Sequence, residues 1–64
     1  MKIKITNAEL PVAPDVRPEV GSVHEVVRLR EVGGSVMYFI RIDGFGLNGA
    51  QIGVMAADCE VVEG

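Results

Sequence analysis

The stretch that decides the fold is Val36-Met37-Tyr38-Phe39-Ile40-Arg41-Ile42-Asp43, because its side chains alternate between two faces with the period of a β-strand. One face carries four apolar residues: Val36, Tyr38, Ile40 and Ile42. The opposite face carries Met37, Phe39, Arg41 and Asp43. Large apolar groups on both faces are typical of a strand covered on both sides, or of one whose second face is a binding surface.

The segment before this strand is expected to pair with it as an antiparallel hairpin, because Gly33 and Gly34 form a turn signal between two apolar runs. That segment, Ser22 to Val32, also partly fits a helix, since Ser22 and Glu25 have the spacing of a capping box. Its high content of valine and leucine favours a strand. The alternation predicts Val23, Val27 and Leu29 on one face, with Arg28 and Arg30 on the other.

The two ends of the chain supply three more predicted strands. Residues 1–6 alternate, with Ile3 and Ile5 on one face and Lys2, Lys4 and Thr6 on the other. Residues 8–21 contain three prolines and are predicted to form a long irregular loop. After a glycine-rich turn at residues 43–49, two short strands at 51–55 and 59–62 flank a single helical turn at 56–58. The prediction is an all-β fold with five strands, in one domain that spans residues 1–64.

Composition limits the functions that such a fold could carry. A chain of 64 residues has a small core, which leaves no room for an elaborate enclosed active site. Its net charge of −3 makes nucleic acid a poor partner, although Lys2 and Lys4 together with Arg28 and Arg30 could form a small basic stripe if their strands pair. The single cysteine cannot form an internal disulfide, and no apolar run has the length of a signal peptide or a membrane span. We therefore expect a cytoplasmic protein without a membrane partner.

Motifs for catalysis are weak in this sequence. Gly44, Gly46 and Gly49 match G-x-G-x-x-G, but too few residues follow them for the helix and parallel sheet of a dinucleotide site, so a hairpin turn is the preferred reading. His24 and Cys59 are the only histidine and the only cysteine, and neither a third catalytic group nor a zinc site can be built around them. Cys59 is expected to be a small buried hydrophobe and His24 a strand surface residue. We predict no enzymatic activity, no cofactor and no metal.

The order of the predicted elements resembles that of an SH3-like barrel. Residues 18–27 (PEVGSVHEVV) are similar to the diverging turn and second strand of SH3 domains, and residues 53–62 (GVMAADCEVV) are similar to their closing segment. The chain also resembles short SH3-like proteins of bacteria and their prophages. The resemblance implies a small five-stranded barrel with a long first loop and a one-turn helix before the last strand.

The aromatic residues with which SH3 domains grip proline-rich peptides are missing at the matching positions. The chain has no tryptophan, and Ala56 and Cys59 stand where that family has proline and tyrosine. We expect a non-enzymatic module that binds a protein of unknown identity through its loops and any exposed part of the central strand. The candidate partner surface comprises Leu10, Pro11, Pro14, Pro18, Met37, Phe39, Phe45 and Leu47.

Other interpretations of the function stay open. The prophage resemblance also fits an inhibitor or decoy whose acidic C-terminal half occupies a basic site on a host protein. Pro11 and Pro14 form a P-x-x-P string that another protein could read, although stiffening of their own loop is the preferred reading. A homo-oligomer, in which a second copy completes the small core, is a third alternative.

Overall fold

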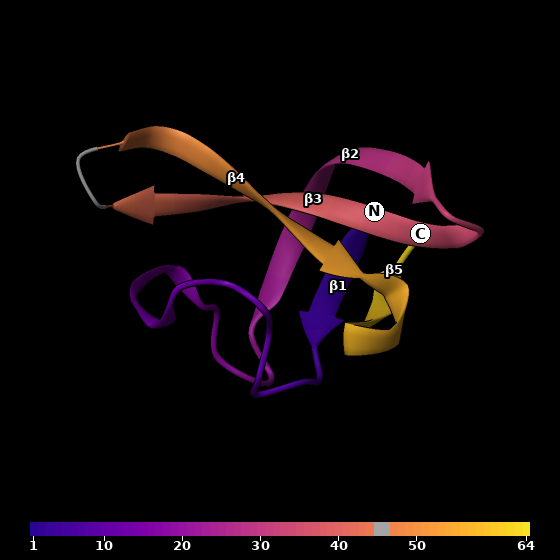
Figure 1. Ribbon diagram of the computed structural model, residues 1–64, viewed down its shortest axis with the longest axis horizontal. Coiled ribbons are helices and arrows are strands. Elements are labelled where there is room, and N and C mark those ends of the chain that lie inside the picture. Colours follow the sequence, from indigo (N-terminus) through magenta and orange to yellow (C-terminus); the bar gives the residue numbers. More distant parts are fainter. Residues whose placement is uncertain (45–46) are drawn as a thin grey trace.

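The computed structural model describes the backbone of residues 1–44 and 47–64, and it shows an all-β chain. Its five strands are β1 (Lys2–Ile5), β2 (Val23–Val32), β3 (Ser35–Gly44), β4 (Leu47–Met55) and β5 (Cys59–Glu63). Two 3₁₀ turns, η1 (Pro14–Val16) and η2 (Ala56–Asp58), interrupt the connections. All strand pairs are antiparallel, in the order β4-β3-β2-β1-β5 (Figure 1).

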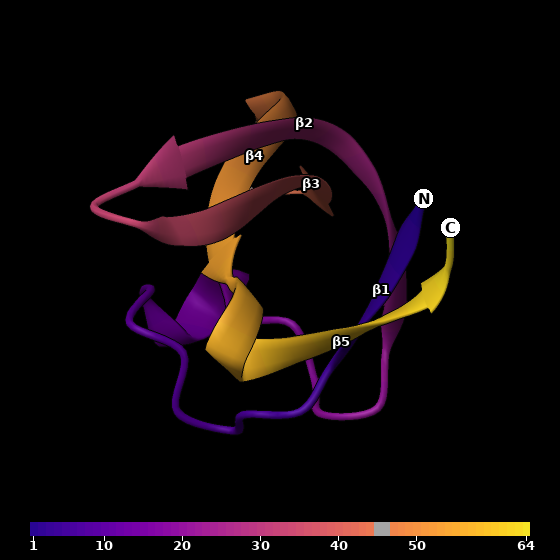
Figure 2. The same cartoon turned by 90° about the vertical axis from the view of Figure 1, so that its right-hand side faces the viewer.

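Strand β2 connects the two halves of the sheet. Its first residues pair with β1, and the residues from Val26 onward pair with β3. Figure 2 shows β2 curving from the side of β1 over the top of the molecule to its hairpin with β3. A β-bulge lies in this curve, because Val26 pairs with Ile40 while Arg28 pairs with the adjacent Phe39. Such a bulge bends a strand and increases its twist, so it allows β2 to serve both halves.

The bulge corrects the prediction for the faces of β2. Val26 and Arg28 are two residues apart on β2, yet they pair with adjacent residues of β3. The alternation of β2 side chains between the inner and outer faces is therefore shifted by one residue at the bulge. Val23 pairs with Lys4 on the outer face, whereas Leu29 pairs with Tyr38 on the inner face. The predicted shared face of Val23, Val27 and Leu29 is therefore wrong. Arg28 and Arg30 do share a face, as predicted, because both follow the bulge.

The sheet is curled but open, which corrects the expectation of a closed barrel. Strands β4 and β5 stand at its two ends, and η2 separates them along the chain. Two residues on inner rows are exposed: Leu29, opposite Tyr38, at 47%, and Val61, opposite Ile3, at 46%. The two ends of the chain lie close together on β1 and β5, where Lys2 pairs with Glu63 (Figure 2).

The core lies between the inner face of the sheet and the first loop. Its fully buried members come from four parts of the chain: Ile3 and Ile5 of β1, Leu10 of the loop, Ile40 of β3 and Val54 of β4. Cys59 completes it at 8% exposed, as predicted for a small buried hydrophobe. The predicted alternation of β1 and β3 is confirmed, since Ile3, Ile5 and Ile40 face this core while Lys2, Lys4 and Arg41 are exposed.

The long first loop was predicted correctly, and hydrogen bonds fix both of its ends. At its start, the Asn7 side chain donates to Asp58 Oδ1 (2.9 Å), and the backbone N–H groups of Thr6 and Asn7 donate to the Asp58 carbonyl. At its end, the Gly21 N–H donates to the Ile5 carbonyl (2.8 Å). The loop therefore closes one side of the core.

One of the two predicted hairpin turns is confirmed, and the second hairpin differs from its prediction. Gly33 and Gly34 adopt φ values of +57° and +83°, which only glycine adopts without strain, and they form the predicted turn between β2 and β3. The second hairpin is longer than expected, because β3 reaches Gly44 and β4 already begins at Leu47. Of the predicted turn at 43–49, residues 43–44 and 47–49 are strand, and residues 45–46 lie outside the described residues. The G-x-G-x-x-G string that begins at Gly44 leads into strand β4, whereas a dinucleotide-binding fingerprint would require a helix there.

Candidate functional site

The outer face of β2, β3 and β4 gathers arginine, methionine and aromatic side chains on the side of the sheet that faces away from the core. The register places them in three rows across the strands. The first row is Arg30, Met37 and Met55, and the second is Arg28, Phe39 and Gly53. The third row is Arg41 and Gln51. We call these eight residues the arginine–methionine face. Its arginines are exposed, and Met37, Phe39 and Met55 are half-buried.

Gly53 makes room for the apolar part of this face. A Cβ atom at this position would overlap the Met37 sulfur and come within 3.4 Å of the Phe39 ring. The side chains of Met37 and Phe39 therefore lie over the bare backbone of β4. The absence of a side chain at Gly53 lets two large apolar groups lie flat on the sheet and become half-buried without entering the core.

Arg28 completes this cluster with a cation–π contact. Its guanidinium carbon lies 4.6 Å from the centre of the Phe39 ring. Such a contact stabilises an exposed pair by about 0.5–1 kcal/mol and fixes the orientation of the long arginine side chain. A guanidinium stacked in this way keeps its in-plane N–H groups available for carboxylate or phosphate. Arg28 is thus held in place on one side and free to donate on the other.

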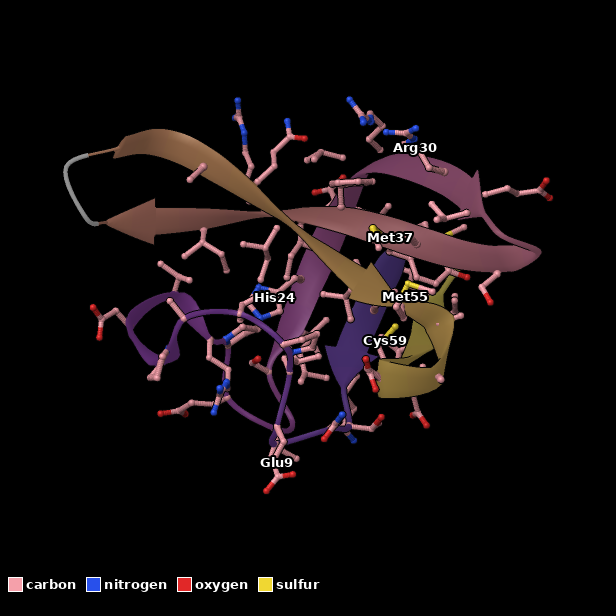
Figure 3. The ribbon with its side chains drawn as sticks, in the orientation of Figure 1. Glu9, His24, Arg30, Met37, Met55 and Cys59 are labelled. Carbon is pink, nitrogen blue, oxygen red and sulfur yellow. The ribbon has the colours of Figure 1, made fainter. Side chains whose placement is uncertain are left out.

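The arginines of this face have no anionic partner among the side chains that the structure describes, which are those of residues 1–42 and 50–64. Within that part of the chain, the one ion pair joins Lys2 Nζ to Glu63 Oε2 at 3.7 Å, on the outer face of β1 and β5. Figure 3 shows Arg30 above the sheet and Glu9 on the opposite side, in the first loop. Within the described side chains, no carboxylate neutralises Arg28, Arg30 or Arg41, and the side chain of Asp43 lies outside them.

The residues predicted as a partner surface do not form one surface. Leu10 is 1% exposed and belongs to the core, so the prediction that it meets a partner is wrong. Pro11 and Pro14 are exposed on the loop, and Pro18 is half-buried. Met37 and Phe39 do come together, over Gly53. Phe45, and the side chain of Leu47, lie outside the described residues.

Sequence reasoning missed six members of the site: Arg28, Arg30, Arg41, Gln51, Gly53 and Met55. The arginines were noted as exposed strand residues, and Arg41 was placed on the face of Met37 and Phe39. Nothing local showed that Arg28 and Arg30 share that same face, because the bulge in β2 and the register with β3 decide it. The one usable signal was Gly53, a glycine inside a predicted strand, which often marks a close approach of other groups to the backbone.

His24 and Cys59 occupy separate structural positions. The Ser22 hydroxyl donates to the Glu19 carbonyl (2.5 Å), so the His24 Nε2–H donates to Ser22 Oγ (2.8 Å). His24 is half-buried on the inner row opposite Ile3, which corrects the prediction of a simple surface position, and burial lowers its pKa. The Cys59 thiol donates to the Met55 carbonyl (3.6 Å), and burial, together with the nearby Asp58 carboxylate, raises its pKa.

Burial therefore favours the uncharged form of both groups, and the Asp58 carboxylate adds to this effect at Cys59. A thiol with a raised pKa is a poor nucleophile at neutral pH. Among the residues that the structure describes, no three His, Cys, Asp or Glu side chains come together as a metal site would need. In the same part of the chain, no helix has both the length and the apolar character to cross a membrane.

Comparison with protein-family models, with curated proteins and with solved structures gives no match to this chain.

Proposed function

We propose that this chain is a non-enzymatic, SH3-like protein-binding module, in keeping with its resemblance to short SH3-like proteins of bacteria and prophages. The element order supports the fold assignment: a strand, a long loop, three strands joined by short turns, a 3₁₀ turn and a last strand. The pairing of β1 with both β2 and β5, and the division of β2 between two halves of the sheet, are also what that architecture requires. The protein belongs to the cytoplasm in this proposal.

The single observation that carries the binding function is the half-burial of Met37 and Phe39 on the outer side of the sheet. A chain of this size needs most of its large apolar groups inside, yet these two lie outside the core. Methionine, aromatic residues and arginine are the types enriched at protein interfaces, and all three meet here. The arginine–methionine face, rather than the proline loop, is the partner surface.

Site-specific photo-crosslinking in the host cell tests this proposal. A benzophenone amino acid replaces Phe39 in one variant and Val23 in a matched control. Val23 is an exposed apolar residue at 51%, on the outer face next to β1. We expect a discrete protein adduct from position 39 and none from position 23. Circular dichroism verifies that both variants keep their β-sheet signal.

Other crosslinking results would contradict this assignment. Equal adducts from positions 39 and 23 would mean that the arginine–methionine face is not the partner surface. A third probe at Glu60, which lies on β5 opposite Lys4, tests the acidic decoy. If that position alone gave an adduct, and if irradiation of a cell lysate at high salt gave none, the inhibitor hypothesis would replace this proposal.

A further inference from the structure

The charge on the arginine–methionine face indicates what kind of protein surface it binds. Three of the six basic residues of a chain with net charge −3 lie on this one face, and each comes from a paired strand. Arginine presents a planar fork of N–H donors that fits a carboxylate with two parallel hydrogen bonds. No carboxylate among the described side chains of residues 1–42 and 50–64 occupies these donors. Complementary charge therefore points to an acidic partner.

The spacing of the arginines indicates the shape of that partner. Arg28 and Arg30 are two residues apart on β2 after the bulge, so their side chains leave the same face about 6–7 Å apart. Alternate residues of an extended peptide have the same separation. Met37 and Phe39, directly opposite these arginines on β3, supply an adaptable apolar surface beside the charges. An extended segment can therefore place two carboxylates and one apolar side chain on this face.

The same details disfavour nucleic acid as the occupant. Single-stranded nucleic acid needs aromatic rings on which its bases can stack, along a continuous basic groove. The Phe39 ring on this face is already covered by Arg28. Beyond the bend of β2, the outer face of the sheet carries Glu25, Glu60 and Glu63 along with Lys2 and Lys4, so the basic surface does not continue. Discrete carboxylates match two arginines at a set spacing along one strand better than a long polyanion does.

We infer that the arginine–methionine face binds an extended acidic segment of a partner protein, with two carboxylates two residues apart on Arg28 and Arg30 and an apolar side chain on Met37 and Phe39. This inference rests on the proposed protein-binding function and adds the chemical class of the partner.

Fluorescence anisotropy with a synthetic peptide tests the inference on the full chain. The probe is a fluorescein-labelled peptide with two copies of Glu-Ser-Glu-Ser-Leu, and its control has Gln in place of each Glu. We expect saturable binding of the Glu peptide that weakens as salt rises from about 50 mM to about 500 mM, because exposed ion pairs are screened. The Gln peptide should bind about tenfold more weakly or worse, since two charge pairs are lost.

Two double variants with the same change in charge provide the matched control. Arg28→Ala with Arg30→Ala should weaken binding of the Glu peptide by about tenfold, the sum expected for two exposed pairs. Lys2→Ala with Lys4→Ala, on the outer face of β1, should change it less than about twofold, by weakened long-range attraction alone. Circular dichroism spectra of both variants establish that the fold is retained.

Several outcomes overturn the inference. The Glu peptide could show no saturable binding, or the arginine and lysine variants could lose affinity equally, which would indicate non-specific attraction. A labelled oligothymidylate that bound more tightly than the Glu peptide would make nucleic acid the occupant. If the peptide fails while position 39 still crosslinks to a host protein, only the acidic class of partner is wrong. If crosslinking at position 39 fails as well, the proposed protein-binding function is also wrong.

Discussion

The two faces of β3 have similar compositions, but only the inner face carries a fully buried residue, because Tyr38 and Ile42 are half-buried like Met37 and Phe39. The inner face carries Tyr38, Ile40 and Ile42, of which Ile40 is fully buried. The outer face carries Met37 and Phe39, which are large and apolar too but only half-buried. The difference comes from their surroundings, because β1 and the first loop cover the inner face, whereas the outer face has only the neighbouring side chains of its own sheet. An apolar residue in a small sheet is therefore not by itself evidence of a core.

Truncating one residue on each face should give the largest difference in stability. Ile40→Ala removes a fully buried side chain and should lower the free energy of unfolding by about 2–5 kcal/mol. Because a domain of this size has only about 3–5 kcal/mol in total, most of the protein should then be unfolded. Phe39→Ala should cost about 1 kcal/mol or less, chiefly the cation–π contact with Arg28. Urea titration followed by circular dichroism measures both, and equal losses would contradict the assignment of the two faces.

The comparison of a buried side chain with an exposed one can also be made in the first loop, at two adjacent residues. Leu10 is fully buried, and Leu10→Ala should cost about 2–4 kcal/mol. Its exposed neighbour Pro11 has no core contact, and Pro11→Ala should change stability by about 1 kcal/mol at most, mainly through the unfolded chain. Thermal melts of the two variants test this. If Leu10→Ala had the same melting temperature as the wild type, the loop would not be part of the core.

Alanine substitutions at two glycines distinguish a constraint on backbone conformation from a constraint on side-chain packing. Gly34→Ala forces a side chain onto a residue with φ +83° in the β2–β3 turn, and should cost about 1–2 kcal/mol although space there is open. Gly53→Ala instead meets the flexible Met37 side chain on the outer face, which can rotate toward solvent, so its cost should stay below about 1 kcal/mol. Chemical denaturation ranks the two. The reverse order would mean that the outer cluster is rigidly packed.

The smallest expected effect concerns His24, on the inner row of β2. Burial lowers its pKa in the folded state below the ordinary value of 6.5. As pH falls through that value, the unfolded chain takes up a proton that the folded chain binds less readily, so stability decreases toward acid. Melting temperatures at about pH 7.5 and about pH 5.5 should show a small fall in the wild type. His24→Gln should show a smaller one, and an unchanged slope would exclude His24 as the cause.

Local patterns predicted most of the elements, because each depends on neighbouring residues. The alternation of residues 36–42 correctly separated the two faces of β3, and the Gly33-Gly34 pair correctly located a hairpin. The faces of β2 were predicted wrongly before Arg28, because a bulge has no clear signature in the sequence. Leu10 was assigned to a partner surface because its loop is polar and rich in proline, and its burial depends on β1, β3 and β4. Local patterns therefore did not place the five site members of β2 and β4 on one face with Met37 and Phe39: Arg28, Arg30, Gln51, Gly53 and Met55.

By itself, the sequence determined a valine-rich, all-β chain with strands, turns and a proline loop, since period-two alternation, glycine turns and proline backbone limits act over a few residues. Only the tertiary structure decided that the sheet stays open, that Leu10 lies inside, and that Arg28 and Arg30 share a face with Met37 and Phe39. Those facts depend on register and packing between strands far apart in the chain. A shift of one residue in pairing moves a side chain to the other face, so no local pattern can fix such a site.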